Sequence, residues 1–108
     1  MSLKIIEQAE AVRDAIAASD HVAAYSSLNA SDKFSEAVKS AYRQIADMLN
    51  IGTLRDYGRS ELKGMRMWRI PKYPKYLVFY YATGSELYIL RVLHGSQDIA
   101  AIFRAPGE

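Results

Sequence analysis

The stretch Glu86-Leu-Tyr-Ile-Leu-Arg-Val-Leu-His-Gly-Ser-Gln-Asp-Ile-Ala-Ala-Ile-Phe103 decides the fold of this chain. Its first half alternates as a β-strand does. One face is expected to carry Leu87, Ile89, Arg91 and Leu93, and the other Tyr88, Leu90, Val92 and His94. After a break at Gly95-Ser96, helical spacing begins, with apolar residues at Ile99, Ile102 and Phe103. An arginine and a histidine thus end a nearly apolar strand, where ionisable groups need a partner or a function.

Two more strands are expected just before this stretch, at 66–70 and 76–81. The second of them, Tyr76-Leu-Val-Phe-Tyr-Tyr81, is apolar or aromatic on both faces, which is typical of a central strand. Pro71 and Pro74 bracket the first connection, and Thr83-Gly84-Ser85 forms the second, tighter one. Short connections of this kind predict antiparallel neighbours.

The N-terminal third predicts a short strand over 3–6 and an amphipathic helix over 7–27. The start of this helix stays open between Ile5 and Val12, because Ile5 and Ile6 also fit its apolar stripe. The face expected to be buried carries Ala9, Val12, Ile16 and then Val22 or Ala23.

A second helix is expected over 31–49, where apolar residues recur every three or four positions at Phe34, Val38, Ala41, Ile45 and Leu49. A turn over 29–31 precedes it, and Asn29 is the expected N-cap, with Asp32 three residues later. Gly52 is expected to mark the end of the helix. Residues 53–64 are polar and contain glycines, which predicts a loop.

The predicted fold class is α+β: two N-terminal helices on a small, mainly antiparallel sheet, with a short C-terminal helix. A length of 108 residues is enough for one core, so a single domain over 1–108 is expected. The chain has no cysteine, no apolar run long enough for a membrane span and no signal peptide, which predicts a cytoplasmic protein.

The charge is balanced overall, with a formal net charge of +2, but the middle of the chain is basic. Residues 55–75 contain seven cations, Arg55, Arg59, Lys63, Arg66, Arg69, Lys72 and Lys75, against Asp56 and Glu61. Such a stretch could face phosphates or an acidic partner, or form a solvated edge that discourages aggregation. The residues leave these two readings open.

Signatures of catalysis are few. His21 and His94 lie far apart without metal-ligand spacing, and the glycines form no phosphate loop, so neither a metal nor a cofactor is expected. His94 can shuttle protons near neutrality, and Arg66 and Arg91 could stabilise a phosphorane, as a metal-free ribonuclease requires. The alternative is structural: His94 then hydrogen-bonds a backbone carbonyl and pins the turn before the last helix.

Three blocks, in order, resemble one protein family. Gly64-Met-Arg-Met-Trp-Arg-Ile70 resembles its Gly-Leu-Arg strand, and Tyr76-Leu-Val-Phe-Tyr-Tyr81 its Tyr-Leu-Ile-Phe-Tyr-Arg strand. Ile89-Leu-Arg-Val-Leu-His-Gly-Ser-Gln-Asp98 resembles its Ile-Leu-Arg-Val-Leu-His-Gly-Ala-Arg-Asp ending. With the second helix, the resemblance to the ParE toxins of the ParE/RelE superfamily covers residues 31–103. It implies two helices on an antiparallel sheet.

The resemblance implies the toxin of a bacterial type II toxin–antitoxin system, with plasmid stabilisation as its role. It also implies a cognate ParD- or RelB-like antitoxin. ParE-type relatives inhibit DNA gyrase by protein contact, which is the favoured reading. No tyrosine follows His94 here, whereas several ribonuclease relatives carry a C-terminal catalytic one. The residues expected to bind target or antitoxin are Arg66, Trp68, Arg69, Arg91, His94, Ile99 and Phe103.

Two alternatives accompany this reading. A RelE-like endoribonuclease that cuts mRNA on the ribosome would use Arg66, Arg91, His94 and Tyr81. An inert member of the superfamily would only bind antitoxin, and Tyr81 and Gln97 favour it, because arginine is common in the family at both positions. Direct contact with nucleic acid stays open. Apolar surface that antitoxin normally covers would encourage a homodimer.

Overall fold

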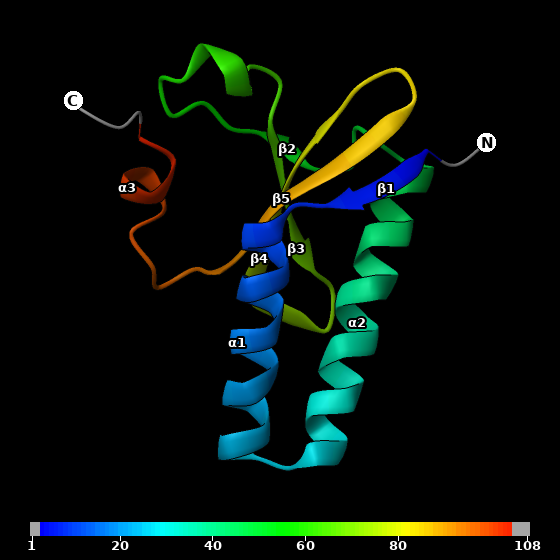
Figure 1. Cartoon of the computed structure of the whole chain (residues 1–108), viewed down its shortest axis with the longest axis vertical. Helices are drawn as coiled ribbons and strands as arrows, with labels where there is room; N and C mark the ends of the chain where they lie inside the picture. Colours follow the sequence, from blue (N-terminus) through cyan, green and yellow to red (C-terminus); the bar gives the residue numbers. More distant parts are fainter. Residues whose placement is uncertain (1–2, 105–108) are drawn as a thin grey trace.

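The computed structural model describes residues 3–104 of the predicted domain; residues 1–2 and 105–108 lie outside this description. The elements in chain order are β1 (Lys4–Glu7), α1 (Ala9–Tyr25), α2 (Leu28–Asp47), β2 (Thr53–Leu54), η1 (Ser60–Leu62, a 3-10 turn), β3 (Arg66–Ile70), β4 (Tyr73–Ala82), β5 (Glu86–His94) and α3 (Ile99–Phe103). Figure 1 shows α1 and α2 as a hairpin that projects from the sheet, and α3 lies apart from this hairpin. The predicted α+β class is confirmed.

The five strands form one sheet in the order β1-β5-β4-β3-β2. The β3–β4 and β4–β5 pairs are antiparallel, as predicted, and β4 is indeed the central strand. The pair of β2 with β3 is also antiparallel, but β2 was not predicted. The short N-terminal strand β1 lies parallel to β5, with Ile5 opposite Leu87. The first and the last strands of the chain are therefore neighbours.

The predicted alternation of β5 fails halfway along the strand. Tyr80 of β4 lies opposite Ile89, but Phe79 lies opposite Arg91, so Leu90 is an extra residue in β5. Such a bulge moves the following side chains to the other face. Val92 therefore joins Leu87 and Ile89 under the helices, and Leu93 lies on the opposite face.

Each face of the sheet carries its own hydrophobic core. The first core lies under α1 and α2 and includes Phe34, Ile45, Tyr80 and Ile89, all at most 1% exposed. The second core lies on the other face, where α3 and the β2–β3 connection cover Met65, Met67, Leu77, Phe79 and Leu93. Phe103 of α3 completes it.

The buried face of α1 differs from the predicted one. Ala11 and Ala18 are buried, whereas Val12 is 37% and Ile16 56% exposed. Small alanine side chains allow α1 to approach α2 and β5 closely, and the larger apolar residues of the helix then point outward. The predicted stripe thus lies on the surface at Ala9, Val12 and Ile16, whereas its last position, Val22, is half-buried against the first core, as predicted.

The second helix keeps its predicted stripe but not its predicted ends. Phe34, Val38, Ala41 and Ile45 are buried, as expected. The helix begins at Leu28, and the N-cap is Ser27, whose Oγ accepts a hydrogen bond from the Ala30 N–H (3.0 Å). Asn29 lies inside the helix and is not the cap. A hydroxyl of a preceding serine satisfies the first turn equally well.

The segment after α2 is more structured than the predicted loop over 53–64, since it contains β2 and η1. The helix ends at Asp47, so Gly52 is not its terminator. Gly52 is instead required by a close approach, because a Cβ there would lie 2.8 Å from both the Met67 carbonyl oxygen and the Tyr80 hydroxyl.

Candidate functional site

Arg91 of β5 is held by two carboxylates of α1. Its Nε and Nη2 donate to Asp14 Oδ2 and Oδ1 (2.7 and 3.0 Å), and its Nη1 donates to Glu10 Oε2 (3.2 Å). Asp14 Oδ2 also accepts the backbone N–H of Val92 (3.0 Å). The hydrogen bonds with Asp14, together with the charges of Asp14 and Glu10, raise the pKa of Arg91 further above its ordinary value. Arg91 therefore has a structural partner.

This contact closes an open edge of the sheet. β1 pairs with β5 only as far as Ile89, and the Gln8 N–H donates to the Ile89 carbonyl (2.9 Å). Beyond that point Asp14 takes the place of a strand neighbour by accepting from Val92. An unpaired strand edge invites unwanted pairing, and here a helix side chain covers it.

Arg66 belongs to a second polar network, at the end of α2. Its Nη1 donates to the Gly52 carbonyl (2.7 Å), and the Gly52 N–H donates to the Tyr80 hydroxyl (2.9 Å). That hydroxyl donates in turn to the Leu49 carbonyl (2.6 Å). Burial raises the pKa of Tyr80, although the Gly52 hydrogen bond and the charge of Arg66 oppose this rise. The network ties the α2–β2 connection to the sheet.

His94 pins the turn that leads from β5 into α3. Its Nδ1 accepts the Ser96 N–H (3.1 Å) and lies 2.7 Å from Ser96 Oγ, while its backbone N–H donates to Gln97 Oε1 (2.7 Å). The ring also packs edge-on against Tyr76, with centroids 5.0 Å apart. The structural interpretation predicted that the His94 side chain would hydrogen-bond a backbone carbonyl, but its partner is Ser96 instead.

The remaining predicted site residues lie in different surroundings. Tyr81 lies beside Tyr88, with ring centroids 6.4 Å apart. Trp68 is half-buried against the first core, and exposed Arg69 donates to the Pro74 carbonyl (3.1 Å).

The two predicted residues of α3 face inward. Phe103 is only 4% exposed, and its ring contacts Phe79 and Tyr57, with centroids 4.8 and 5.3 Å apart. Ile99 is half-buried in the same core. As long as α3 stays in place, Phe103 cannot reach a partner.

The structure does not gather the four residues that a ribonuclease site would need. Arg66 lies opposite Tyr80, whereas His94 lies opposite Tyr76, at the other end of β4. Arg91 reaches α1, away from both.

The sequence predicted Arg91 as a site residue but did not predict its partner Asp14. A signal was present, because Asp14 shares a helical stripe with Ala11 and Ala18, and an acid on a buried stripe requires a partner.

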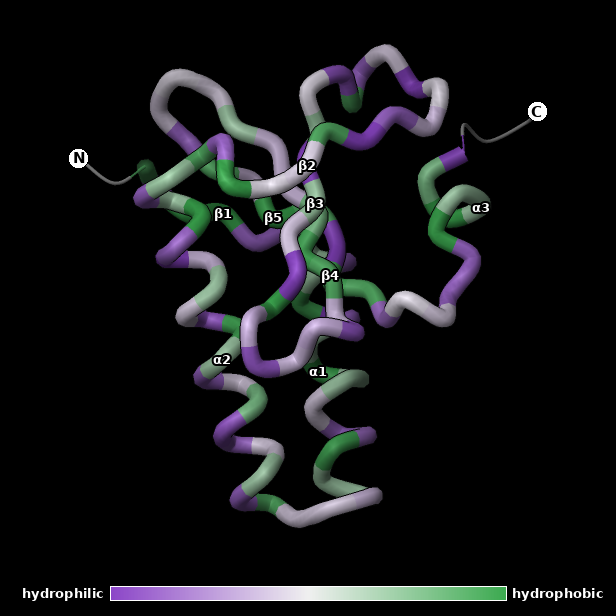
Figure 2. Tube along the Cα trace, turned by 180° about the vertical axis from the view of Figure 1, so that it is seen from behind, coloured by the Kyte–Doolittle hydropathy of each residue, from purple (hydrophilic) through white to green (hydrophobic). Residues whose placement is uncertain are grey.

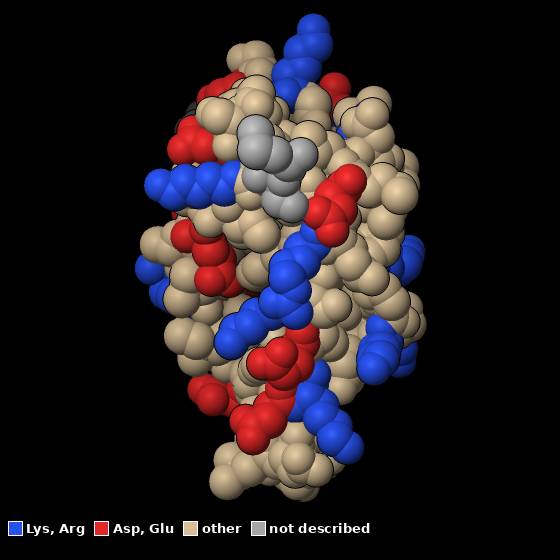
Figure 3. Space-filling view, turned by 90° about the vertical axis from the view of Figure 1, so that its right-hand side faces the viewer, with Lys and Arg blue, Asp and Glu red and all other residues tan. Residues whose placement is uncertain are grey.

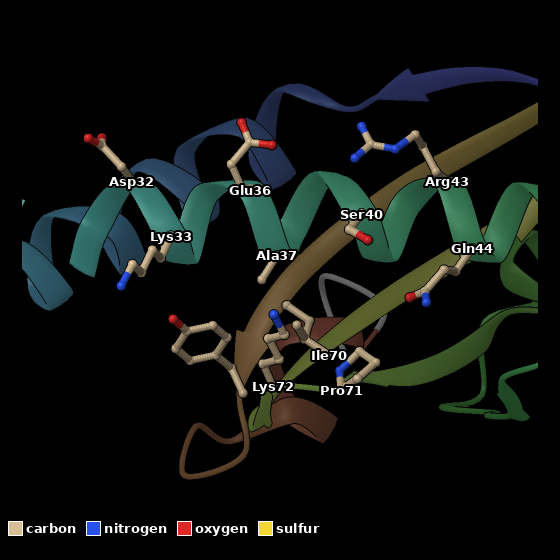
Figure 4. A pocket seen from close by; sticks show the side chains of 11 residues that line it. Asp32, Lys33, Glu36, Ala37, Ser40, Arg43, Gln44, Ile70, Pro71 and Lys72 are labelled. Atoms are coloured by element: carbon tan, nitrogen blue, oxygen red, sulfur yellow. The ribbon is translucent and has the colours of Figure 1, made fainter. Parts of the chain in front are cut away.

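A groove lies between α2 and the β3–β4 turn, with a volume of about 700 Å³. The side chains that point into it from α2 are those of Ala37, Ser40 and Gln44, which lie opposite Ile70 and Pro71. The side chains of Asp32, Glu36 and Arg43 point outward in Figure 4.

Among residues 3–104, no three His, Cys, Asp or Glu side chains are grouped as metal ligands would be. Within the same residues, no helix has the length and apolar character needed to cross a membrane.

The fold and these contacts define a small α+β protein in which the strand-end arginine and histidine both have structural partners. The family described as ParE toxin of type II toxin-antitoxin system, parDE, matches residues 5–99. The chain therefore belongs to the ParE toxin family, and the ParDE system implies a ParD antitoxin as its partner. The predicted resemblance is confirmed.

A solved structure described as "Chromosomal ParDE TA system from P. aeruginosa" shares the fold. The TM-score is 0.69 at 19% sequence identity, over 86% of this chain and 96% of the other. At this level of identity, the similarity concerns the fold. No curated protein matches the chain.

Proposed function

We propose that the chain inhibits DNA gyrase by protein–protein contact and is held inactive by its ParD antitoxin. One observation carries the choice of contact over RNA cleavage: Arg91, the arginine of the strand-end motif, is bound bidentately by Asp14 inside the fold. Arg66 and His94 are likewise engaged, by Gly52 and Ser96. A toxin that works by contact does not need these side chains as catalysts.

The tip of the α1–α2 hairpin is the surface that we assign to the target. Residues 22–31 contain no charged side chain. Two large apolar residues project from this tip, Tyr25 at 82% and Leu28 at 79% exposure. Figure 3 shows the lower end of the molecule without charged side chains, whereas acidic and basic groups alternate above it. Exposed aromatic and aliphatic side chains of this kind are typical anchors of protein interfaces.

The outward stripe of α1 is the surface that we assign to the antitoxin. Val12 and Ile16 lie one helical turn apart and are exposed, because alanines fill the buried side of the helix. An amphipathic antitoxin helix could cover such a stripe with its own apolar face. The stripe and the hairpin tip involve different residues, so the two assignments can be tested separately.

The experiment that tests the target is pulse-labelling of new DNA and new protein in bacteria just after induction of this chain without antitoxin. We expect DNA synthesis to stop first, while translation continues. An early stop in protein synthesis would overturn the gyrase proposal. It would make Arg66, Arg91 and His94 the first residues to mutate.

Matched variants test the two surfaces on purified gyrase. Leu28→Ser should weaken inhibition of supercoiling at least about tenfold, as expected for an interface anchor. Met48→Ser, at a 61% exposed apolar residue beyond the other end of α2, is the control and should inhibit like the wild type. Ile16→Ser should keep inhibition but bind the antitoxin more weakly. Equal losses in Leu28→Ser and Met48→Ser would contradict the assignment of the tip.

A further inference from the structure

The connection between β2 and β3 is an ordered loop on the side of the second core. Its neck is closed by a hydrogen bond from the Arg55 N–H to the Met65 carbonyl (2.9 Å). Inside the loop, Asp56 Oδ1 accepts the Gly58 N–H (2.8 Å), and Tyr57 and Leu62 pack against the second core. The loop therefore holds its side chains in place, although β2 and β3 could be joined by a much shorter turn.

This loop encloses an open groove of about 430 Å³ with a basic lining. Arg55, Arg59 and Lys63 line it, and among the described lining residues Asp56 is the only acid. The Asp56 carboxylate already accepts from Gly58. Arg59 contacts Glu61 through Nε (3.0 Å), and Glu61 itself does not line the groove. The lining thus carries an excess of positive charge.

Two glycines of the groove leave its backbone open to a ligand. Gly58 and Gly64 have φ values of +85° and +91°, which residues with a Cβ rarely adopt. A Cβ at either position would meet nothing within 4 Å, so the space beside both is empty. Glycine is used where a ligand approaches the backbone closely, and the guanidinium groups of Arg55 and Arg59 can bind phosphate oxygens bidentately.

The two grooves differ in the acidic residues beside their cations. The larger groove beside α2 has two, Asp32 and Glu36, which point outward from it in Figure 4, and the β2–β3 groove has Asp56 alone among its described lining residues. In Figure 2 the β2–β3 connection is largely purple, and it lies at the end of the molecule away from the hairpin tip. A ligand in the basic groove would leave both proposed protein surfaces accessible.

We propose that the groove formed by Arg55, Arg59 and Lys63 binds the phosphate backbone of duplex DNA. An open groove lined by three cations fits a polymer that carries a phosphate at every unit. The choice of DNA rests on the proposed gyrase target, because a toxin bound to gyrase lies beside the DNA that gyrase holds. Contacts to phosphates carry no sequence information, so binding without sequence preference is expected.

Fluorescence anisotropy of a short labelled DNA duplex, titrated with the full chain in the absence of gyrase, tests this proposal. The wild type should bind, and its affinity should fall steeply from about 50 to about 200 mM salt. The triple variant Arg55→Gln, Arg59→Gln, Lys63→Gln should reduce the slope of log affinity against log salt by about 3. The control Lys4→Gln, Arg13→Gln, Lys39→Gln removes the same charge elsewhere and should reduce the slope far less.

Three outcomes would overturn the proposal. One is absence of DNA binding by the wild type at low salt. Another is an equal reduction of the salt slope in the two triple variants. The third is competition in which a polyglutamate peptide, but not unlabelled DNA, displaces the probe, since the ligand would then be an acidic protein. If the triple variant does not fold, Lys63→Gln alone should still reduce the slope by about 1. DNA binding without gyrase inhibition would instead refute gyrase as the proposed target, and the proposal that the groove binds DNA would still hold.

Discussion

The two faces of the sheet are covered in different ways. The first core lies under two helices of 17 and 20 residues, which also contact each other. The second core lies under a helix of five residues and the β2–β3 loop. A helix of five residues has almost no stability of its own. The position of α3 therefore depends on Phe103, which contacts Phe79 and Tyr57, together with the half-buried Ile99 and Ile102, whereas the first face is held by the side chains of two long helices.

The largest expected effect contrasts Phe34→Ala with Phe103→Ala. Phe34 is fully buried and packs against Tyr73 and Tyr76, each with ring centroids 5.0 Å away, so its loss should lower the free energy of unfolding by about 3–5 kcal/mol. Phe103→Ala should cost only about 2 kcal/mol, because α3 can detach without unfolding the sheet. Urea denaturation measures both values. Hydrogen exchange in the second variant should be faster in α3 alone. Equal losses of unfolding free energy in the two variants would show that the two faces contribute equally to stability.

A smaller effect is expected for Asp14→Asn, which breaks the ion pair between Asp14 of α1 and Arg91 of β5. The Asp14 and Arg91 side chains are 14% and 21% exposed, so the pair is intermediate between a surface and a buried ion pair. The loss should be about 2 kcal/mol of unfolding free energy. Glu10→Gln removes the same charge from a carboxylate that is 61% exposed, and should cost less than about 0.5 kcal/mol. Similar values for the two variants would contradict the role given to Asp14.

The smallest effect concerns alkaline pH and Tyr42, which donates to Glu7 Oε2 (2.8 Å) in the first face. Burial and then this hydrogen bond raise the pKa of Tyr42 well above its ordinary value. Unfolded tyrosine loses its proton near pH 10, so the stabilising contribution is complete below that value and falls as pH rises above it. Tyr42→Phe should therefore show a shallower decline in unfolding free energy above about pH 10. Burial raises the pKa of Tyr80 as well, so part of the decline should persist. Identical declines would exclude Tyr42 as a contributor.

Two strands, β3 and β5, were predictable because their signals are local. The prediction of β4 over 76–81 was too short, since β4 begins at Tyr73 and contains Pro74, and β2 was missed. Apolar alternation and the turn residues Pro71 and Gly84 placed β3 over its observed range and β5 within one residue of it. The bulge at Leu90 could not be predicted, because it lies where β5 changes its edge partner from β1 to Asp14. That change is a tertiary event with no local signature.

The contacts of the site were harder to predict than the site residues. A partly buried arginine in β5 requires a counter-charge, but Asp14 lies 77 positions earlier in the chain. The face of α1 was also undecidable by periodicity alone, since Ala11 and Ala18 form one stripe and Val12 and Ile16 another beside it. Hydrophobicity favours the larger residues, and close packing against α2 and β5 selects the alanines.

The pairing of β1 with β5 has a consequence for how the toxin is made. β1 leaves the ribosome before the other described elements, but its partner strand begins only at Glu86. The helices α1 and α2 can form early, yet Asp14 meets Arg91 only after β5 has been synthesised. Contacts between distant parts of a chain also form late in folding. A growing chain thus cannot complete the sheet or form the contact between Asp14 and Arg91 before β5 has left the ribosome.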